Sequence, residues 1–150
     1  MERLYLDTSV FGGYFEPEFE HWTKILFERI EKGYYKLLLS ELTNIELAKA
    51  PQNIQDLILS VPQVQLENIE ITDNANKLAE TYINENVVRE TSRADCLHIA
   101  LATLNNADIL VSWNFKHIVN INRIRGYNAV NYQNGLKMLE IRTPREILEI

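Results

Sequence analysis

The chain has 150 residues, of which 46% are hydrophobic and 24% charged, and its formal net charge is −6. This length and composition suit one globular domain, which we expect to span residues 1–150, and they exclude a disordered or low-complexity protein. No run of 18 apolar residues occurs, so we expect no transmembrane helix. Cys96 is the single cysteine, which excludes an internal disulfide and fits a reducing cytoplasm, where we expect the protein to reside.

The charges are unevenly distributed along the chain. Residues 109–139 contain no acid but include Lys116, Arg123, Arg125 and Lys137, which leaves 11 basic against 21 acidic residues elsewhere. A basic segment on an acidic protein is typical of a surface that docks a polyanion or an acidic partner. A solvated helix face explains the same pattern, and the sequence leaves both interpretations open.

In the first half of the chain, short apolar runs predict strands, and apolar residues that recur every three or four positions predict helices. The predicted strands cover 3–6, 36–39 and a segment within 64–71 that is best placed at 69–71. The predicted helices cover 21–31, 40–49, 53–59 and about 72–83. Residues 12–20, with two glycines and Pro17, are expected to form a loop.

The second half continues the alternation of helices and strands. After a polar connection at 84–91, we expect a helix over 92–104, a buried strand over 109–111 and a turn at 113–117. A helix over 121–136, broken or restarted near Gly126, precedes a strand over 138–141. Thr143-Pro144-Arg145-Glu146 reads as a capping box that opens a short final helix. Strands alternating with helices predict an α/β fold, with a mostly parallel sheet between two layers of helices.

Asp7 is the first candidate functional residue, because it follows the apolar run that ends at Leu6. Ligands of open parallel sheets bind just outside the carboxyl ends of the strands. Taken alone, an aspartate at this position more often caps or turns the chain. Glu46, beside the apolar stripe of its predicted helix, is a second candidate, and Glu41 in the first turn of that helix competes with it.

Asp95 and Asn114 complete the candidate set. Asp95 lies three residues after Ser92, which is also the spacing of a helix capping box, while His98 lies one turn further along the same helix face. His98 alone is more typical of a core histidine than of a ligand. Asn114 follows a buried strand, where asparagine often makes a turn, but its neutral oxygen can also face a metal or its bound water.

Three carboxylates and an amide form the hard-oxygen set that suits Mg²⁺ or Mn²⁺. Such an ion can polarise a phosphoryl oxygen and activate water. The chain has no H-x-x-x-H or C-x-x-C spacing, which argues against zinc. Asp7, Glu46, Asp95 and Asn114 are therefore predicted to form one metal-dependent phosphodiesterase site.

At these positions the chain resembles the PIN-domain family of metal-dependent ribonucleases, which includes the VapC-type toxins of toxin–antitoxin pairs. The matching pieces are L-D-T-S at 6–9, S-E-L-T-N-I-E-L at 40–47, R-A-D-C-L-H-I-A-L-A at 93–102 and L-V-S-W-N-F-K-H-I at 110–118. The resemblance covers essentially the whole chain and implies a three-layer PIN-like α/β/α fold.

The resemblance carries the family's three metal-binding acids onto Asp7, Glu46 and Asp95. Asn114 falls where many members have a fourth acid, so the site has a charge of −3 rather than −4, which weakens metal binding. Thr8, Ser9 and Ser112 are candidate supports for the carboxylates. The family assignment implies hydrolysis of RNA with Mg²⁺ or Mn²⁺, a separate antitoxin partner and a homodimer. Arg93, Lys116, His117, Arg123 and Arg125 are our candidates for binding RNA phosphates.

Two other functions compete with the nuclease. A phosphotransferase of the haloacid-dehalogenase kind also uses an aspartate after the first strand, but it needs a second aspartate where this chain has Ser9. A PIN-like fold retained as a binding module, with weak or no catalysis, is the second, and Asn114 is the feature that favours it. Carboxylate-dependent Mn²⁺ binding separates this module from an active nuclease.

Overall fold

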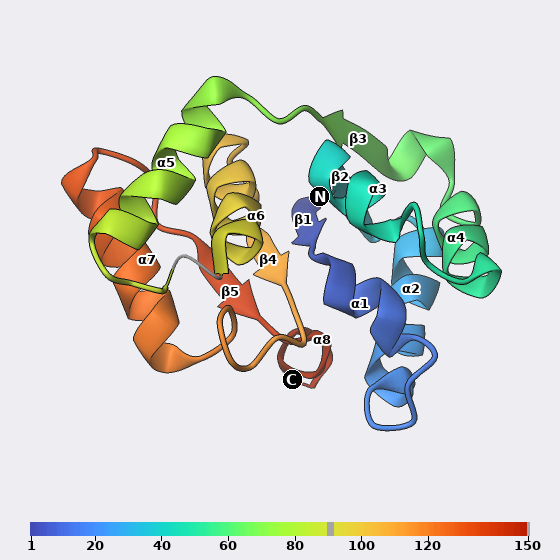
Figure 1. Ribbon diagram of the computed structural model, residues 1–150. Helices are drawn as coiled ribbons and strands as arrows, with labels where there is room; N and C mark the ends of the chain where they lie inside the picture. The colour runs from blue at the N-terminus through green and yellow to red at the C-terminus, as the bar shows by residue number, and fades with distance from the viewer. Residues whose placement is uncertain (90–91, 150) are drawn as a thin grey trace.

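The computed structural model describes residues 1–89 and 92–149, in which five strands alternate with helices (Figure 1). The strands are β1 (Glu2–Leu6), β2 (Tyr35–Ser40), β3 (Leu66–Ile69), β4 (Ile109–Val111) and β5 (Glu140–Arg142). The helices are α1 (Thr8–Gly13), α2 (Glu20–Glu31), α3 (Glu41–Leu47), α4 (Gln52–Leu59), α5 (Asp73–Asn84), α6 (Arg93–Leu104), α7 (Ile121–Gln133) and α8 (Pro144–Leu148), with a 3-10 turn η1 (Gln63–Gln65). No helix of the described residues is long and apolar enough to cross a membrane.

The five strands form one sheet in the order β3-β2-β1-β4-β5, and each of the four strand pairs is parallel. β1 lies at the centre, where Tyr5 pairs with Leu38 of β2 and Leu110 of β4. Because all five strands run the same way, their carboxyl ends lie at one edge of the sheet. The prediction of an α/β fold with a parallel sheet is confirmed.

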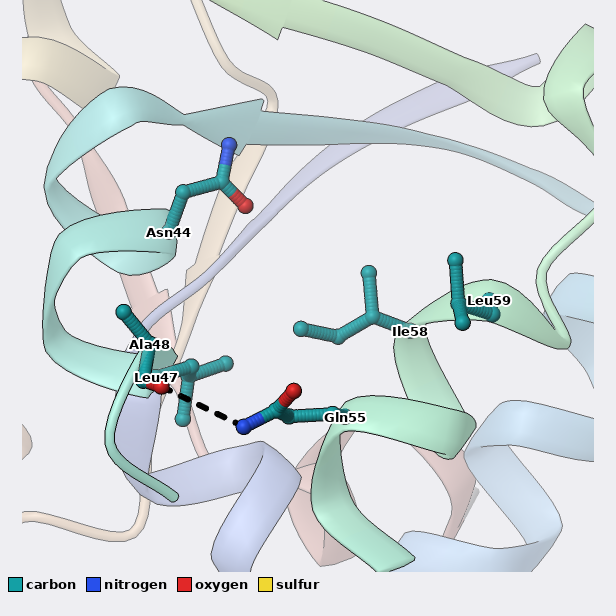
Figure 2. Close-up of a pocket in the computed structure, with 6 residues that line it drawn as sticks. All are labelled: Asn44, Leu47, Ala48, Gln55, Ile58 and Leu59. Carbon is teal, nitrogen blue, oxygen red and sulfur yellow. Dashed lines mark hydrogen bonds between the residues drawn. The ribbon is translucent and has the colours of Figure 1, made fainter. Parts of the chain in front are cut away.

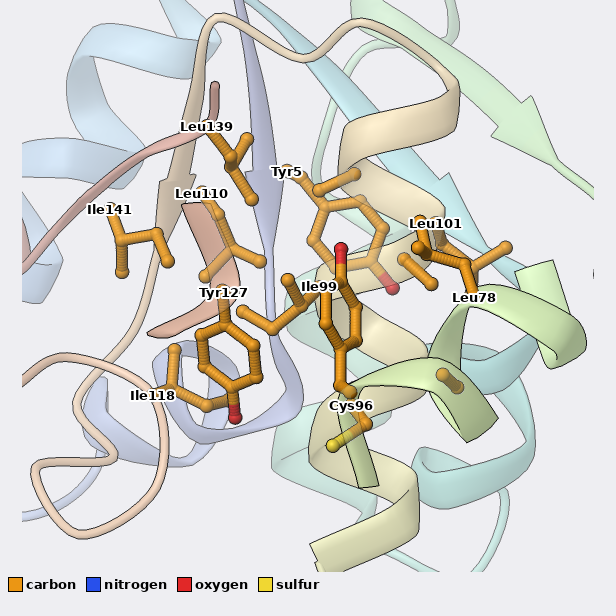
Figure 3. Packing of buried hydrophobic residues seen from close by; sticks show 14 of the residues in the cluster. Tyr5, Leu78, Cys96, Ile99, Leu101, Leu110, Ile118, Tyr127, Leu139 and Ile141 are labelled. Atoms are coloured by element: carbon orange, nitrogen blue, oxygen red, sulfur yellow. The ribbon is translucent and has the colours of Figure 1, made fainter. Parts of the chain in front are cut away.

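Alternate residues of the strands face two separate cores, as the two-residue period of a strand requires. Tyr5 and Leu110 pack against α5, α6 and α7 on one face (Figure 3). Leu38 belongs to the same core. Leu4 and Leu6 point to the opposite face, where α1, α2, α4 and α8 cover the sheet. Figure 1 shows these two sets of helices on opposite sides of the strands, which gives the three layers that the sequence predicts.

Several predicted helix starts are correct and have the expected physical cause. The Ser40 hydroxyl accepts a hydrogen bond from Thr43 N at 3.1 Å, and Thr72 caps α5 in the same way through Ala75 N. Thr143 and Glu146 form the predicted capping box, with proline at the first helical position.

Several predicted boundaries differ from the structure. The expected loop at 12–20 begins as helix, because α1 starts at Thr8 and ends at Gly13. β3 lies at Leu66–Ile69, within the apolar stretch but earlier than 69–71, because it pairs with β2 in the register that sets Leu37 opposite Leu66. α7 is unbroken at Gly126, and the last strand begins at Glu140.

The glycine in the middle of α7 has a packing role rather than a breaking one. A Cβ on Gly126 would lie 2.7 Å from Val87 Cγ1, so only glycine lets the connection after α5 pack this closely. That connection was expected over 84–91, and its residues 90 and 91 lie outside the described part of the chain.

Candidate metal-dependent site

The structure brings the four predicted site residues to the carboxyl edge of the sheet, from different elements. Asp7 follows β1, and Asn114 follows β4 after two further residues. Glu46 lies in the last turn of α3, the helix that begins directly after β2, and Asp95 lies in the first turn of α6. Asp95 interacts electrostatically with both Asp7 and Glu46, so the three carboxylates share one electrostatic environment.

Asp7 is buried and held by two hydroxyl groups. Ser9 Oγ donates to one carboxylate oxygen at 2.6 Å, and Ser112 Oγ donates to the other at 2.6 Å. Burial raises the pKa of Asp7, although these two hydrogen bonds act in the opposite direction. Asp7 stands at the N-cap position of α1 without a side-chain capping bond, so the capping explanation of this residue is wrong.

Glu46 is held by hydrogen bonds from two elements. Thr8 Oγ1 donates to Oε1 of Glu46 at 2.6 Å, and His98 Nε2 lies 2.5 Å from the same oxygen. Burial works to raise the pKa of Glu46, but the hydrogen bonds from His98 and Thr8 outweigh it and lower the pKa. Glu41, the competing glutamate, instead accepts a hydrogen bond from Ile71 N at 2.9 Å, which assigns it to the support of the strand connection.

Asp95 is part of this acid cluster rather than of a helix cap. Ser92 makes no side-chain capping bond at the start of α6, so the capping box that the spacing also allowed is not formed. Burial raises the pKa of Asp95, nearby Glu46 raises it further, and the neighbouring histidines His117 and His98 lower it. Oδ1 of Asp95 accepts a hydrogen bond of 3.3 Å from the amide of Asn114.

Asn114 has the turn role, and the side-chain oxygen that the sequence analysis expected to face a metal is used in that turn. Its side-chain oxygen accepts from His117 N at 3.0 Å and so closes the turn after β4, while its side-chain nitrogen faces Asp95. An aspartate in this place would set a negative charge against Asp95. The amide of Asn114 therefore avoids adding to the electrostatic repulsion between the carboxylates.

The donor set fits a hard divalent cation by its chemistry and charge. Burial raises the pKa of two of the three carboxylates, Asp7 and Asp95, and a neighbouring carboxylate raises each further, so a bound divalent cation would offset their negative charge. Within residues 1–89 and 92–149, no lysine or arginine forms an ion pair with Asp7, Glu46 or Asp95. In the same described ranges, no three acids, histidines or cysteines enclose one point as a preformed metal cage.

The five predicted phosphate-binding residues are divided between the site and the surrounding surface. Lys116, which is exposed, and His117 lie two and three residues after Asn114, and the His117 ring interacts electrostatically with Asp95. Arg93, two residues before Asp95, pairs with Glu80 of α5. The other two lie on α7.

The two arginines of α7, Arg123 and Arg125, have different surroundings. The guanidinium of Arg123 donates to the main-chain oxygen of Val87, so it stabilises the connection after α5. Arg125 is exposed and lines a shallow hollow with Tyr132 and Met138. Lys116 and His117 are thus the two candidates in the turn that contains Asn114, while Arg93 is the candidate nearest to Asp95 in the chain.

The residues that sequence analysis missed are those that fix the walls of the site. Tyr5 reads as one more apolar residue of β1, yet its hydroxyl lies 2.7 Å from Nδ1 of His98. Trp113 Nε1 donates to Thr23 Oγ1 at 2.9 Å, and its main-chain nitrogen donates to Ser9 Oγ at 3.0 Å. A polar aromatic residue inside an otherwise aliphatic strand was the available signal for Tyr5.

A separate hollow between α3 and α4 contains none of the site residues (Figure 2). Leu47, Ile58 and Leu59 make its lining apolar, and Gln55 crosses it to donate to the main-chain oxygen of Ala48 at 3.3 Å. Asn44 and Leu47 of α3 help to line it, but Glu46 of the same helix does not.

The fold and the acid cluster define an α/β protein with a parallel sheet and a carboxylate site at its carboxyl edge. The PIN-domain model matches residues 4–116, and the chain therefore belongs to the PIN-domain family. No curated protein sequence matches the chain.

A solved structure shows the same fold. The crystal structure of VapBC2 from Rickettsia felis, bound to a DNA fragment from its promoter, contains a chain that matches with a TM-score of 0.58 and 18% identity. The match covers 94% of this chain and 98% of the other. The predicted family is thus confirmed by the family model, and the predicted architecture by the structural match.

Proposed function

We propose that this PIN-domain protein is a metal-dependent endoribonuclease and the toxin of a toxin–antitoxin pair. The observation that supports the proposal is the convergence of Asp7, Glu46 and Asp95, from three separated segments, at the carboxyl edge of the sheet. PIN-domain membership supports the nuclease, and the likeness to a VapBC structure supports the toxin. As that structure contains a VapB–VapC pair, a separate antitoxin is the partner we propose, together with a homodimer in the cytoplasm.

Asp7, Glu46 and Asp95, with Asn114, are the residues that would hold Mg²⁺ or Mn²⁺. When bound, such an ion supplies Lewis-acid polarisation of the phosphate and a water of lowered pKa. In the hydrolysis, the water oxygen bonds to phosphorus and the bond from phosphorus to the 3′-oxygen breaks. The products carry a 5′-phosphate and a 3′-hydroxyl.

The chain's own residues orient the carboxylates and the RNA. Ser9 and Ser112 fix Asp7, Thr8 fixes Glu46, and Asn114 fixes Asp95. Lys116 and His117 are our candidates for contacting the phosphates nearest the acids, and Arg93, Arg123 and Arg125 would extend the positive charge outward.

The test is cleavage of a mixed pool of structured RNAs in Mg²⁺, Mn²⁺ or EDTA. We expect cleavage only with metal, loss of cleavage in Asp7→Asn, and full activity in Asp73→Asn, which changes an exposed aspartate at the start of α5. Equal cleavage in EDTA, or an active Asp7→Asn variant, would overturn the proposed site.

A catalytically inactive binding module is the second candidate function. The amide of Asn114, which faces Asp95 where many family members carry an acid, favours it. Calorimetric titration with Mn²⁺ distinguishes the nuclease from the inactive module. A nuclease site binds Mn²⁺, and Asp7→Asn abolishes that binding. An inactive module shows no Mn²⁺ binding that depends on the carboxylates.

A further inference from the structure

A buried tyrosine–histidine pair leads from the centre of the sheet to Glu46. The hydroxyl of Tyr5 lies 2.7 Å from His98 Nδ1, and His98 Nε2 lies 2.5 Å from Glu46 Oε1. Tyr5 is fully buried and His98 is 2% exposed, so the bond between them is shielded from water, whereas the Glu46 side chain at the other end is 32% exposed. The Tyr5 and His98 rings also meet edge to face, with centroids 5.6 Å apart.

The partners of the imidazole determine which of its nitrogens carries a proton. An ionised carboxylate only accepts hydrogen bonds, so Nε2 of His98 must be the donor to Glu46. A tyrosine hydroxyl can donate or accept, and it therefore satisfies Nδ1 in either state of that nitrogen. The pair thus favours a proton on Nε2 and disfavours the tautomer with a bare Nε2.

The same network anchors both ends of α3. Ser40, which caps the start of the helix, lies 2.8 Å from the Tyr5 hydroxyl. Glu46, in the last turn of the helix, is bonded to His98, which is itself bonded to Tyr5. A displacement of α3 along its axis would break contacts to this network at both ends.

We propose that His98, oriented by Tyr5, is the positioning residue that holds Glu46 in place for a divalent cation. Among the described residues, hydrogen bonds reach only Oε1 of Glu46, from His98 and Thr8. Oε2 is left for the cation. Because a glutamate has three rotatable bonds, fixing one of its oxygens before the cation arrives lowers the entropic cost of binding.

The inference rests on the proposed metal-dependent function and is tested by Mn²⁺ titration calorimetry on the metal-free protein. Loss of a residue that orients a ligand typically costs about 10- to 100-fold in metal affinity. We expect a loss of this size in His98→Leu, and a smaller loss in His98→Gln because its amide can donate to Glu46. Tyr5→Phe should also weaken binding, since the imidazole loses its partner at Nδ1.

Tyr82→Phe is the matched control for Tyr5→Phe. Tyr82 is also fully buried, and its hydroxyl donates to Asn131 Oδ1 at 2.6 Å in the core between α5 and α7. Both variants lose one buried hydroxyl, but only Tyr5→Phe should weaken Mn²⁺ binding. Equal losses in the two, or wild-type affinity in His98→Leu, would overturn the inference. If His98→Leu does not fold, the comparison of the two phenylalanine variants still decides it.

The imidazole nitrogens give a readout that does not depend on metal affinity. The chain has three histidines, so ¹⁵N spectra of the imidazole groups resolve His98 by comparison with the His98→Gln variant. We expect Nε2 of His98 to be protonated without metal and to stay protonated with Mg²⁺. A bare Nε2 in either state would overturn the positioning role, and its deprotonation by Mg²⁺ would make His98 a ligand.

Failure of the inference and failure of the proposed function give different results. A wild-type protein that binds no Mn²⁺ overturns the metal-dependent function and the positioning role with it, whatever the imidazole spectrum shows. A wild-type protein that binds Mn²⁺ equally well with or without His98 keeps the function and removes only the positioning role.

Discussion

The hydroxyl of Ser112 donates to Oδ2 of Asp7 across 2.6 Å and so joins the carboxyl ends of β4 and β1 at the candidate site. The two residues lie 105 positions apart in the chain. Because Ser112 is fully buried, no water can replace its hydroxyl when it is removed. The position of the site's first carboxylate therefore depends on the packing of two neighbouring strands.

Ser112→Ala should destabilise the fold by about 1–3 kcal/mol, the usual cost of leaving a buried polar group unsatisfied. The variant removes the donor to one oxygen of Asp7 and also the acceptor of Asn114 N. Denaturant unfolding measures the loss. The free energy of unfolding of the double variant with Asp7→Asn should change by an amount that differs from the sum of the two single changes, and strict additivity would show that the contact between the two side chains contributes nothing.

Asp7→Asn should raise the stability of the metal-free protein at neutral pH. Burial raises the pKa of Asp7 in the folded state, so its contribution to stability is full below the ordinary carboxyl pKa of 3.8 and is lost as pH rises through the raised folded value. An amide does not ionise and escapes this loss. For a chain of this length, each 1 kcal/mol gained raises the melting temperature by about 2–4 °C.

Thermal unfolding of wild type and Asp7→Asn across pH checks this expectation. The difference between the two melting temperatures should be largest near pH 7 and should shrink below the ordinary carboxyl pKa, where Asp7 is protonated in both states. A variant less stable than wild type at pH 7 would mean that the Ser9 and Ser112 hydroxyls stabilise the carboxylate more than burial penalises it.

The parts of the fold that could be predicted from sequence are those set by local chemistry. Alternation of apolar runs and helical stripes predicts the parallel sheet, and hydroxyl residues at helix starts predict the caps at Ser40, Thr72 and Thr143. The acids follow from the resemblance, because their order along the chain matches the PIN-domain pattern. Thr8, Ser9 and Ser112 could be predicted as supports for the acids, but the partner of each could not be predicted where the contact spans 38 residues, as between Thr8 and Glu46, or 105 residues, as between Ser112 and Asp7.

The missed features have one physical cause, which is tertiary packing that overrides local preference. Gly12 and Gly13 predict a loop, but a Cβ at Gly13 would lie 2.7 Å from Trp113 Cδ1, so the second glycine permits a close approach inside a helix. Gly126 plays the same role against Val87 in α7. A glycine that makes room for a distant side chain is indistinguishable in sequence from one that ends a helix.

Gly13→Ala and Gly12→Ala should therefore act in opposite directions. A methyl at Gly13 meets the Trp113 indole, which is held by its hydrogen bond to Thr23, and we expect a loss of about 1–3 kcal/mol from overpacking. A methyl at Gly12 lies 3.5 Å from Glu16 Oε1, an ordinary contact, so alanine's higher helix propensity should make that variant neutral or more stable. Denaturant unfolding with tryptophan fluorescence measures both, and equal effects would contradict the packing role of Gly13.

Lys116→Gln should weaken RNA binding and lower its salt dependence, whereas Lys137→Gln should leave both nearly unchanged. Both lysines are exposed and belong to the acid-free segment, but Lys116 follows the carboxyl end of β4 and Lys137 precedes the amino end of β5. Loss of one phosphate contact reduces the slope of log affinity against log salt by about 1. Filter binding in EDTA at several salt concentrations measures the slope, and identical slopes in the two variants would remove Lys116 from the RNA surface.

Asn114→Asp should make the stability of the protein depend more strongly on a divalent cation. The variant replaces a hydrogen bond from the amide to Asp95 by repulsion between two carboxylates, so we expect a lower melting temperature in EDTA. With Mn²⁺ present, the added negative charge should tighten binding and raise the melting temperature more than in wild type. Thermal unfolding in EDTA and in a Mn²⁺ series measures both effects. The control is Asn122→Asp, which adds the same charge at an exposed position in the first turn of α7. If Asn114→Asp and Asn122→Asp respond alike to Mn²⁺, Asn114 does not lie at the metal site, and a residue other than Asn114 must complete the set of metal ligands.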